Sequence, residues 1–116
     1  MSAFSLDGQV ALVTGANTGI GQAIAVAMAQ AGAEVIAAGR RDCDETLALI
    51  GARGRGMRLD FSDPMAARDV FAAERIDILV NNAGIIRRDD ATDFSEADWD
   101  DVIDVNLKAV FFTCQA

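Results

Sequence analysis

The residues between Thr14 and Gly21 have the types and the spacing of a phosphate-binding turn. They read Thr-Gly-Ala-Asn-Thr-Gly-Ile-Gly and lie between the apolar run Val10–Val13 and a series of small and apolar residues that starts at Ile20. A strand that leads through glycines into a helix presents free backbone N–H groups and the positive end of the helix dipole to an anion. We expect the turn to hold the diphosphate of a dinucleotide, although a turn with only a structural role is the alternative. The residues expected to bind are Gly15, Asn17, Thr18, Gly19, Ile20 and Gly21.

Two arginines follow the second apolar run of the chain. Many NAD sites, and S-adenosylmethionine sites, have an acid at this point to hold ribose hydroxyls. Here Gly39 occupies the position, and Arg40 and Arg41 come next. Guanidinium groups bind phosphate through two parallel hydrogen bonds, so the pair suits a 2′-phosphate and predicts that NADP(H) is favoured over NAD(H). A solvated loop is the alternative interpretation of the pair.

Polar residues and a glycine also follow the third and fourth apolar runs. Asp60 ends the third run, and Asn82 and Gly84 follow the fourth. Ligands of open α/β sheets bind at the carboxyl ends of the strands. We therefore expect these residues to line one rim with the glycine turn, although each alone could be a turn residue.

Asn106 stands in an apolar stripe between Ile103 and Val110. A buried amide needs hydrogen-bond partners, because leaving it without them costs about 1–3 kcal/mol. Two interpretations remain open. The side chain bonds to main chain and shapes a kink, or it orients water or catalytic side chains.

The elements that must position these residues alternate between strand and helix. Strands are predicted at 10–13, 35–38, 57–60 and 78–80, and helices at 20–31, 46–50, from 62 or 63 to about 74, and from 95 onward. This alternation predicts an α/β, Rossmann-like doubly wound parallel sheet with strand order 3-2-1-4. The strand at 78–80 would then be an open edge. We expect the sheet to be incomplete, with later strands absent, and residues 1–116 to be the N-terminal dinucleotide-binding part of a single domain.

Helical spacing predicts one apolar stripe on the first helix and one on the last. The first contains Ile20, Ala23, Ile24, Ala27, Met28 and Ala31, and the last contains Trp99, Val102, Ile103, Leu107, Val110, Phe111 and Cys114. Gly32 is placed to end the first helix with a left-handed residue. Glycines at 51, 54 and 56 are expected to separate the second helix from the third strand.

Composition excludes several classes of function. The chain has a net charge of −8 and no histidine, which removes histidine-based catalysis and metal binding. The excess acid lies between Asp89 and Asp104, where no basic residue occurs, so it is interpreted as a solvated helix face and nucleic-acid binding is not expected. Cys43 and Cys114 are expected to be free thiols. No apolar run reaches membrane-spanning length, and residues 1–7 do not resemble a secretory signal, so we expect a cytoplasmic protein without a membrane or metal partner.

These motifs together resemble the short-chain dehydrogenase/reductase family over essentially the whole chain. In that resemblance the turn at 14–21 is the cofactor motif, Asp60 contacts adenine with Phe61 beside it, and the Asn81–Gly84 segment passes under the ribose. From that segment the resemblance assigns Asn82, Ala83 and Gly84 to the cofactor, and from Val105-Asn106-Leu107 it assigns Asn106 to the catalytic tetrad.

A narrower resemblance is to the sugar-acid dehydrogenases of that family. Segments 82–88, 94–95 and 98–100 resemble enzymes that act on 2-deoxy-D-gluconate or 2-dehydro-3-deoxy-D-gluconate. The resemblance implies that Arg87 or Arg88 pairs with the substrate carboxylate, whereas a solvated loop arginine is the alternative. It also implies a homotetramer whose interface includes the Asn106 helix.

The chain departs from the family in its catalytic residues. The family uses a serine together with a tyrosine and a lysine three residues apart, and these lie beyond the last helix of this chain. The sequence contains no tyrosine, and its only lysine is Lys108. We expect an oxidoreductase that interconverts a secondary alcohol and a ketone, of which these 116 residues form the cofactor-binding part and are inactive alone. A non-catalytic dinucleotide-binding or scaffold protein is the alternative, and a methyltransferase is less favoured.

Overall fold

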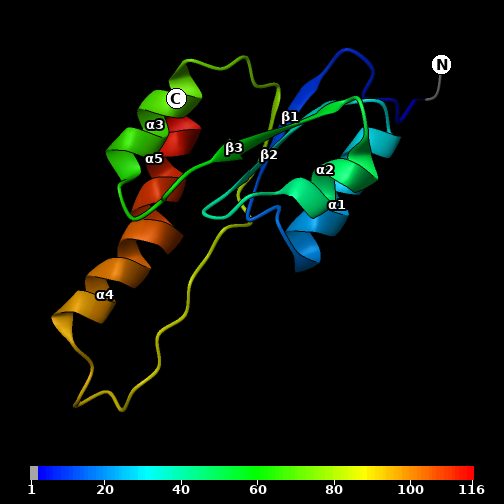
Figure 1. The fold of residues 1–116 in the computed structure, drawn as a ribbon. Helices are drawn as coiled ribbons and strands as arrows, with labels where there is room; N and C mark the ends of the chain where they lie inside the picture. The colour runs from blue at the N-terminus through cyan, green and yellow to red at the C-terminus, as the bar shows by residue number, and fades with distance from the viewer. Residues whose placement is uncertain (1–2) are drawn as a thin grey trace. The chain divides into compact units, whose positions relative to one another are not determined.

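The computed structural model describes residues 3–116, which form two compact units. The first unit comprises the chain up to Leu59 together with Arg75–Ala83, and the second comprises Asp60–Glu74 and Gly84–Ala116. Figure 1 shows the elements of both units along the chain. No helix among the described residues is long and apolar enough to cross a membrane. The signal-peptide expectation includes residues 1 and 2, which lie outside the described residues.

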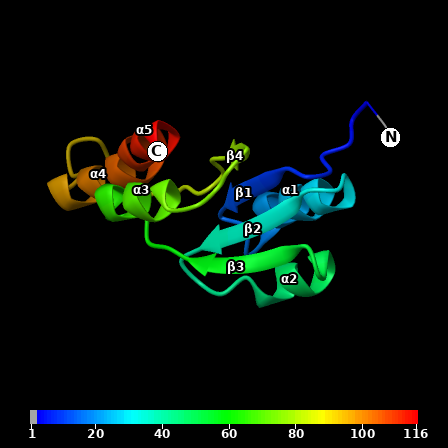
Figure 2. The same cartoon turned by 90° about the horizontal axis from the view of Figure 1, so that it is seen from above.

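A four-stranded parallel sheet organises the first unit. Its order is β3 (Gly54–Arg58), β2 (Glu34–Gly39), β1 (Val10–Thr14) and β4 (Ile78–Val80), as Figure 2 shows. Each pairing is parallel, with Leu12 beside both Ile36 and Leu79. The predicted order 3-2-1-4 is confirmed. The two central strands are buried along almost their whole length, which fits their continuous apolar sequence.

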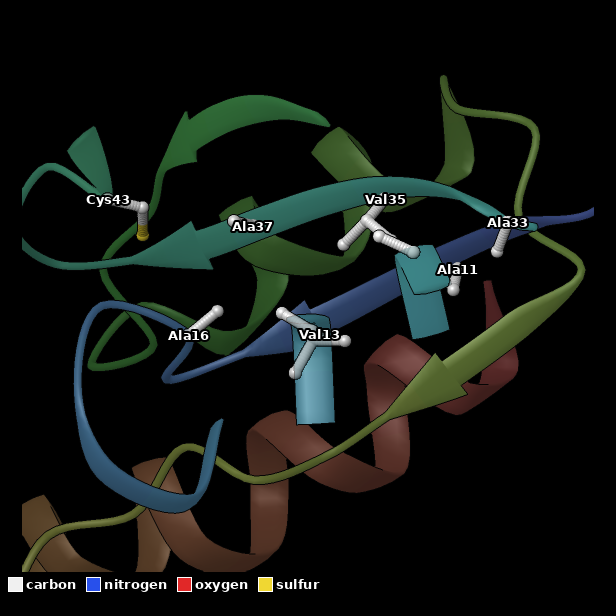
Figure 3. Packing of buried hydrophobic residues seen from close by; sticks show 9 residues of the cluster. Ala11, Val13, Ala16, Ala33, Val35, Ala37 and Cys43 are labelled. Atoms are coloured by element: carbon white, nitrogen blue, oxygen red, sulfur yellow. The ribbon is translucent and has the colours of Figure 1, made fainter. Parts of the chain in front are cut away.

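One face of this sheet packs against α1 (Gly19–Gln30) and α2 (Asp44–Ile50). Figure 3 shows its core, in which β1 and β2 contribute alternate residues. Those residues are Ala11, Val13, Val35 and Ala37, and α1 adds Ala25 and Ala29. Because most of these side chains are small, α1 lies close to the sheet. Cys43 closes the core, and its burial, followed by the charges of Asp42 and Asp44, raises the pKa of its thiol.

The third strand begins earlier than predicted, at Gly54 rather than Met57. Its glycines do not break the structure; they lie within the strand because α2 packs over them. A Cβ at Gly54 would lie 2.9 Å from Ile50 and 3.0 Å from Leu47. A Cβ at Gly56 would lie 3.2 Å from Leu47. These two glycines therefore make room for the helix above the edge of the sheet.

Three helical elements and a π-helical segment form the second unit. They are α3 (Pro64–Ala72), α4 (Glu96–Ile103), the π-helix η1 (Asp104–Lys108) and α5 (Ala109–Gln115). The predicted N-caps are confirmed, since Asp63 accepts from the Ala66 N–H at 3.2 Å and Ser95 accepts from the Asp98 N–H at 3.1 Å. Helices α3 and α5 lie side by side (Figures 1 and 2).

The predicted apolar stripe of the first helix is only partly confirmed. The buried residues of α1 are Gly21, Ala25 and Ala29, with Ile24 and Met28 partly buried beside them. Ile20, expected in the core, is 74% exposed. The fully buried residues are small because the helix approaches the strands closely, so a search for large apolar residues finds Ile24 and Met28 but not Ala25 and Ala29. The end of α1 agrees with prediction, since Gly32 has a φ of 111°.

The stripe of the last helix also needs correction. The residues buried there are Val105, Ala109 and Thr113, whereas Trp99, Leu107 and Phe111 are exposed. The π-helical segment inserts one extra residue into the turn. An extra residue rotates the side chains after it by about 100°, so a constant helical period fails for Leu107 and Phe111. Trp99 precedes the segment, and its exposure has no such explanation. Cys114, also predicted in the stripe, is exposed, and no disulfide joins it to Cys43 within the described residues.

Candidate cofactor site

The glycine turn has the backbone conformation that a tight phosphate loop requires. Gly15 and Gly19 have φ values of 62° and 60°, which residues with a side chain seldom adopt. A Cβ at Gly21 would overlap the carbonyl oxygen of Gly15, so only glycine fits there. Thr18 is the N-cap of α1 and makes no side-chain capping bond. The first N–H groups of α1 are therefore free to bind an anion.

A hydroxyl group joins the ends of β1 and β4 next to this turn. Thr14 Oγ1 donates to the Val80 carbonyl at 3.3 Å and accepts from the N–H groups of Asn82 and Ala83 at 3.0 and 2.9 Å. The Asn82 Nδ2 group donates to the Gly15 carbonyl at 3.4 Å. Side-chain hydrogen bonds thus link the end of β4 to the glycine turn. The structure brings Asn82 and Ala83 next to the turn.

Arg40 and Arg41 lie in the exposed segment between β2 and α2. Neither forms an ion pair within residues 3–116. The side chain of Asn17 lies beside the end of β2, where a Cβ at Gly39 would be 3.3 Å from its Oδ1. The glycine turn and the arginine segment are therefore neighbours in the first unit.

The first unit fits a dinucleotide by two independent criteria. Gly15 and Gly21 are positions at which a Cβ would crowd the backbone of the cradle, so the cradle stays open to a phosphate. Arg40 and Arg41 supply positive charge without an internal counter-ion. Within the described residues no cluster of acids and cysteines could hold a metal ion.

Asp60 and Phe61 belong to the second unit. Asp60 Oδ1 accepts from the Ser62 N–H at 2.9 Å and so shapes the turn before α3. Phe61 is buried and packs edge-on against Phe71, with ring centroids 6.1 Å apart. Of this pair, Asp60 is the residue with a polar group exposed to solvent.

Asn106 lies in the π-helical segment and is exposed, in contrast to the buried amide that its apolar neighbours predict. Its Nδ2 donates to the Ile85 carbonyl at 2.8 Å, and its Oδ1 accepts from the Ile85 N–H at 2.9 Å. A Cβ at Gly84 would lie 3.2 Å from the same Oδ1. The first of the two interpretations describes the contact: the side chain bonds to main chain, and it does so from the π-helical segment, where the helix is locally distorted. Distortions of this kind are frequent at functional sites.

The two arginines after Ile85 have different surroundings. The Nε of Arg87 lies 3.6 Å from Asp98 Oδ1, and its Nη2 lies 4.0 Å from Asp101 Oδ2. Arg88 is exposed and has no ion pair in the described part of the second unit. Part of the acidic run is therefore paired with Arg87 rather than only solvated.

Three polar side chains of the first unit were not singled out from the sequence. They are Thr14 as a hydrogen-bonding hub, and Thr46 and Gln22, which bond near the turn. Thr14 could have been found because it ends a buried strand, where a hydroxyl needs partners. Nothing in the spacing of Thr46 or Gln22 marks them.

The sequence profile described as short chain dehydrogenase matches residues 9–116. The chain therefore belongs to the short-chain dehydrogenase family, a class that its parallel sheet and glycine turn also fit.

Similar proteins include dehydrogenases of sugar acids. The chain is 46% identical to a 2-dehydro-3-deoxy-D-gluconate 5-dehydrogenase of Escherichia coli, over 100% of this chain and 49% of the relative. A Bacillus subtilis protein of the same name is 48% identical, over 97% of this chain and 48% of its own. The chain thus spans about half the length of the curated relatives it matches.

Solved structures agree with the fold. A provisionally named 2-deoxy-D-gluconate 3-dehydrogenase of Agrobacterium tumefaciens, with bound NADP, is 62% identical with a TM-score of 0.91. The match covers 97% of this chain and 47% of that one. A provisionally named NAD(P)-dependent gluconate 5-dehydrogenase of Beutenbergia cavernae, with NADP at low occupancy, is 41% identical with a TM-score of 0.87, over 98% and 49% of the two chains.

Proposed function

We propose that the protein containing this chain is an NADP(H)-dependent oxidoreductase that interconverts a secondary alcohol and a ketone of a sugar acid such as 2-deoxy-D-gluconate. The observation that carries the proposal is the open glycine cradle at the start of α1, with two unpaired arginines beside it in the same unit. The sugar-acid relatives and the NADP-bound neighbours support the substrate class and the cofactor.

The cofactor residues are proposed to act as a set. The N–H groups of the turn hold the diphosphate, and Arg40 and Arg41 hold the 2′-phosphate. Asn82, Ala83 and Gly84 support the ribose, while Asp60 and Phe61 are assigned to the adenine side. These residues belong to one Rossmann-fold domain, of which residues 1–116 are the N-terminal part. Bound cofactor would donate the hydride in ketone reduction and accept it in alcohol oxidation, so this chain contributes binding and orientation.

The carboxylate of the sugar acid is assigned to Arg88. Both arginines of the pair are candidates from the sequence, but Arg87 already pairs with two carboxylates of α4. The free guanidinium of Arg88 is available for a bidentate, charge-assisted bond. Arg87 then acts by holding the segment that carries Arg88.

Of the family's four catalytic residues, only the asparagine has a counterpart in this sequence, Asn106. Its amide holds the Ile85 backbone, which fits a role in orienting water or side chains rather than in proton transfer. The sequence contains no tyrosine, so the proton donor of the family is not among these residues. We therefore propose that residues 1–116 alone are inactive.

A homo-oligomer, and by resemblance a homotetramer, is proposed from the helix that carries Asn106. Trp99, Leu107 and Phe111 are each about 60% exposed there, and exposed large apolar side chains on one element are typical of a contact surface. A cytoplasmic location is also proposed. Light scattering after size exclusion tests the oligomer directly.

Kinetics with the protein as its gene encodes it test the central proposal. We expect reduction of 2-dehydro-3-deoxy-D-gluconate or oxidation of 2-deoxy-D-gluconate with NADP(H), and lower efficiency with NAD(H). Residues 1–116 expressed alone should give no turnover. Activity with neither sugar acid would remove the substrate assignment, and appreciable turnover by the isolated residues would remove the assignment of catalysis to groups outside them.

A further inference from the structure

Two side chains from separate helices meet behind the glycine turn. Thr46, in the first turns of α2, is completely buried, and its Oγ1 donates to the Ala16 carbonyl at 2.6 Å. Gln22, in the first turn of α1, donates through Nε2 to Thr46 Oγ1 at 3.1 Å and to the Asn17 carbonyl at 3.4 Å. All four residues belong to the first unit.

This arrangement is not what the local structure alone would produce. A threonine in a helix can donate back to the carbonyl four residues earlier, as Thr113 does to Ala109 at 2.7 Å. Thr46 is the third residue of α2, so the residue four positions earlier, Asp42, precedes the helix. The Thr46 hydroxyl donates to an acceptor 30 residues away, inside the turn, and so ties the turn to the start of α2.

Both backbone polar groups of Ala16 are hydrogen-bonded, one of them to the Thr46 hydroxyl. The Ala16 N–H donates to the Ala38 carbonyl at 3.1 Å, which ties the residue to β2. Its carbonyl is held by Thr46 from the other side, and Ala16 is fully buried. Without the hydroxyl, the carbonyl would remain buried without a partner, which favours a different path for the turn.

We propose that Thr46, assisted by Gln22, is a positioning residue that preforms the glycine turn for the diphosphate and couples it to the Arg40–Arg41 segment. The inference rests on the proposed nucleotide binding. A turn held before binding loses less conformational freedom when the ligand arrives, so affinity is higher. The diphosphate is common to NADPH and NADH, so loss of the support weakens both by the same factor.

The test uses Thr46→Val, which keeps the shape and removes the hydroxyl, in the protein as its gene encodes it. Titration of nucleotide fluorescence should show Kd values for NADPH and NADH both raised about tenfold, with kcat at saturation little changed. Thr46→Ser should restore affinity. Gln22→Ala should raise both Kd values by a smaller factor. It provides the test of the support if Thr46→Val folds poorly. Thr113→Val is the matched control, since it also removes a buried hydroxyl and should leave Kd unchanged.

The outcomes separate this inference from the proposed function. Equal Kd values for Thr46→Val and the unsubstituted protein would overturn the inference alone. So would a Thr46→Ser variant as weak as Thr46→Val, or a rise confined to NADPH. If the unsubstituted protein bound neither nucleotide, the proposed function itself would be overturned, and this inference with it.

Discussion

The side-chain amide of Asn106 pairs with both backbone polar groups of Ile85, donating at 2.8 Å and accepting at 2.9 Å. The pair resembles two residues of neighbouring strands, but here one partner is a side chain in a π-helical segment. Within the second unit, the Ile85 backbone is therefore fixed to the π-helical segment by a contact that depends on amide chemistry.

Asn106→Asp should be worse than Asn106→Leu at neutral pH. An ionised carboxylate accepts from the Ile85 N–H but repels the Ile85 carbonyl, whereas a protonated carboxyl can donate to it. The folded state therefore favours the protonated acid and raises its pKa. The protonated carboxyl therefore stabilises the folded state fully below its unfolded pKa of about 3.9. This stabilisation is lost as the pH rises through the pKa of the folded state. Denaturation at several pH values should show a loss of about 1–3 kcal/mol near pH 7 that shrinks toward pH 4. Gln30→Ala, an exposed helical amide, should change stability by less than about 0.5 kcal/mol.

Arg88→Ala and Arg87→Ala should separate substrate binding from positioning. Removing Arg88 should raise the KM for the sugar acid by at least about tenfold and leave the KM for NADPH unchanged, because a charge-assisted bond contributes roughly 1.5–3 kcal/mol. Removing Arg87 should have a smaller effect, because its ion pairs with Asp98 and Asp101 are partly exposed. Adding Asp98→Asn to Arg87→Ala should change little, since the Arg87–Asp98 pair is already lost. Equal KM values for Arg88→Ala and the unsubstituted enzyme would rule out Arg88 as the carboxylate ligand.

Arg40→Ala and Arg41→Ala should reduce the preference for NADP(H). Loss of a guanidinium–phosphate contact should raise the Kd for NADPH by about 10- to 100-fold. The Kd for NADH should hardly change, because NADH has no 2′-phosphate. Arg68→Ala is the matched control, because Arg68 pairs with its neighbour Asp69 on α3. Titrations with the two nucleotides side by side are decisive, and a parallel loss for both would contradict the assignment.

Gly21→Ala should abolish nucleotide binding and destabilise the fold. The new Cβ would overlap the Gly15 carbonyl, which is backbone and has no flexible end that could move aside. We expect a loss of at least about 2 kcal/mol in the free energy of unfolding. Gly8→Ala is the comparison, because open space surrounds Gly8 and only its φ of 79° opposes a side chain. That variant should lose about 1 kcal/mol and keep its nucleotide affinity.

Much of the fold could be predicted because its signals are local. Short apolar runs alternating with helical patterns predict the order 3-2-1-4, and Asp63 and Ser95 mark their helix starts through their own side chains. The glycine turn is predictable for the same reason. Its glycines are spaced as the backbone of the turn requires, and they lie within a few consecutive residues.

The sequence-based predictions fail where the structure depends on contacts between residues far apart in the chain. The face that α1 buries depends on how closely the sheet approaches, which Ile20 and Ala25 do not reveal by themselves. The π-helical segment shifts the residues after it, so a constant helical period predicts burial for Leu107 and Phe111, which are exposed. The hydrogen bond from Thr46 to Ala16 joins two segments that have no common pattern.

The bond from Thr14 to Val80 also has a kinetic consequence. It joins residues 66 positions apart, whereas β1 and β2 meet through the much shorter connection that contains α1. Closing a longer loop loses more chain entropy, so contacts between distant residues form later. In pulse-labelled refolding, the amides of Asn82 and Ala83 should therefore gain protection after those of β2. The corner of the sheet that carries the proposed ribose support is the last to assemble, and a nascent chain acquires it only after β4 has been synthesised.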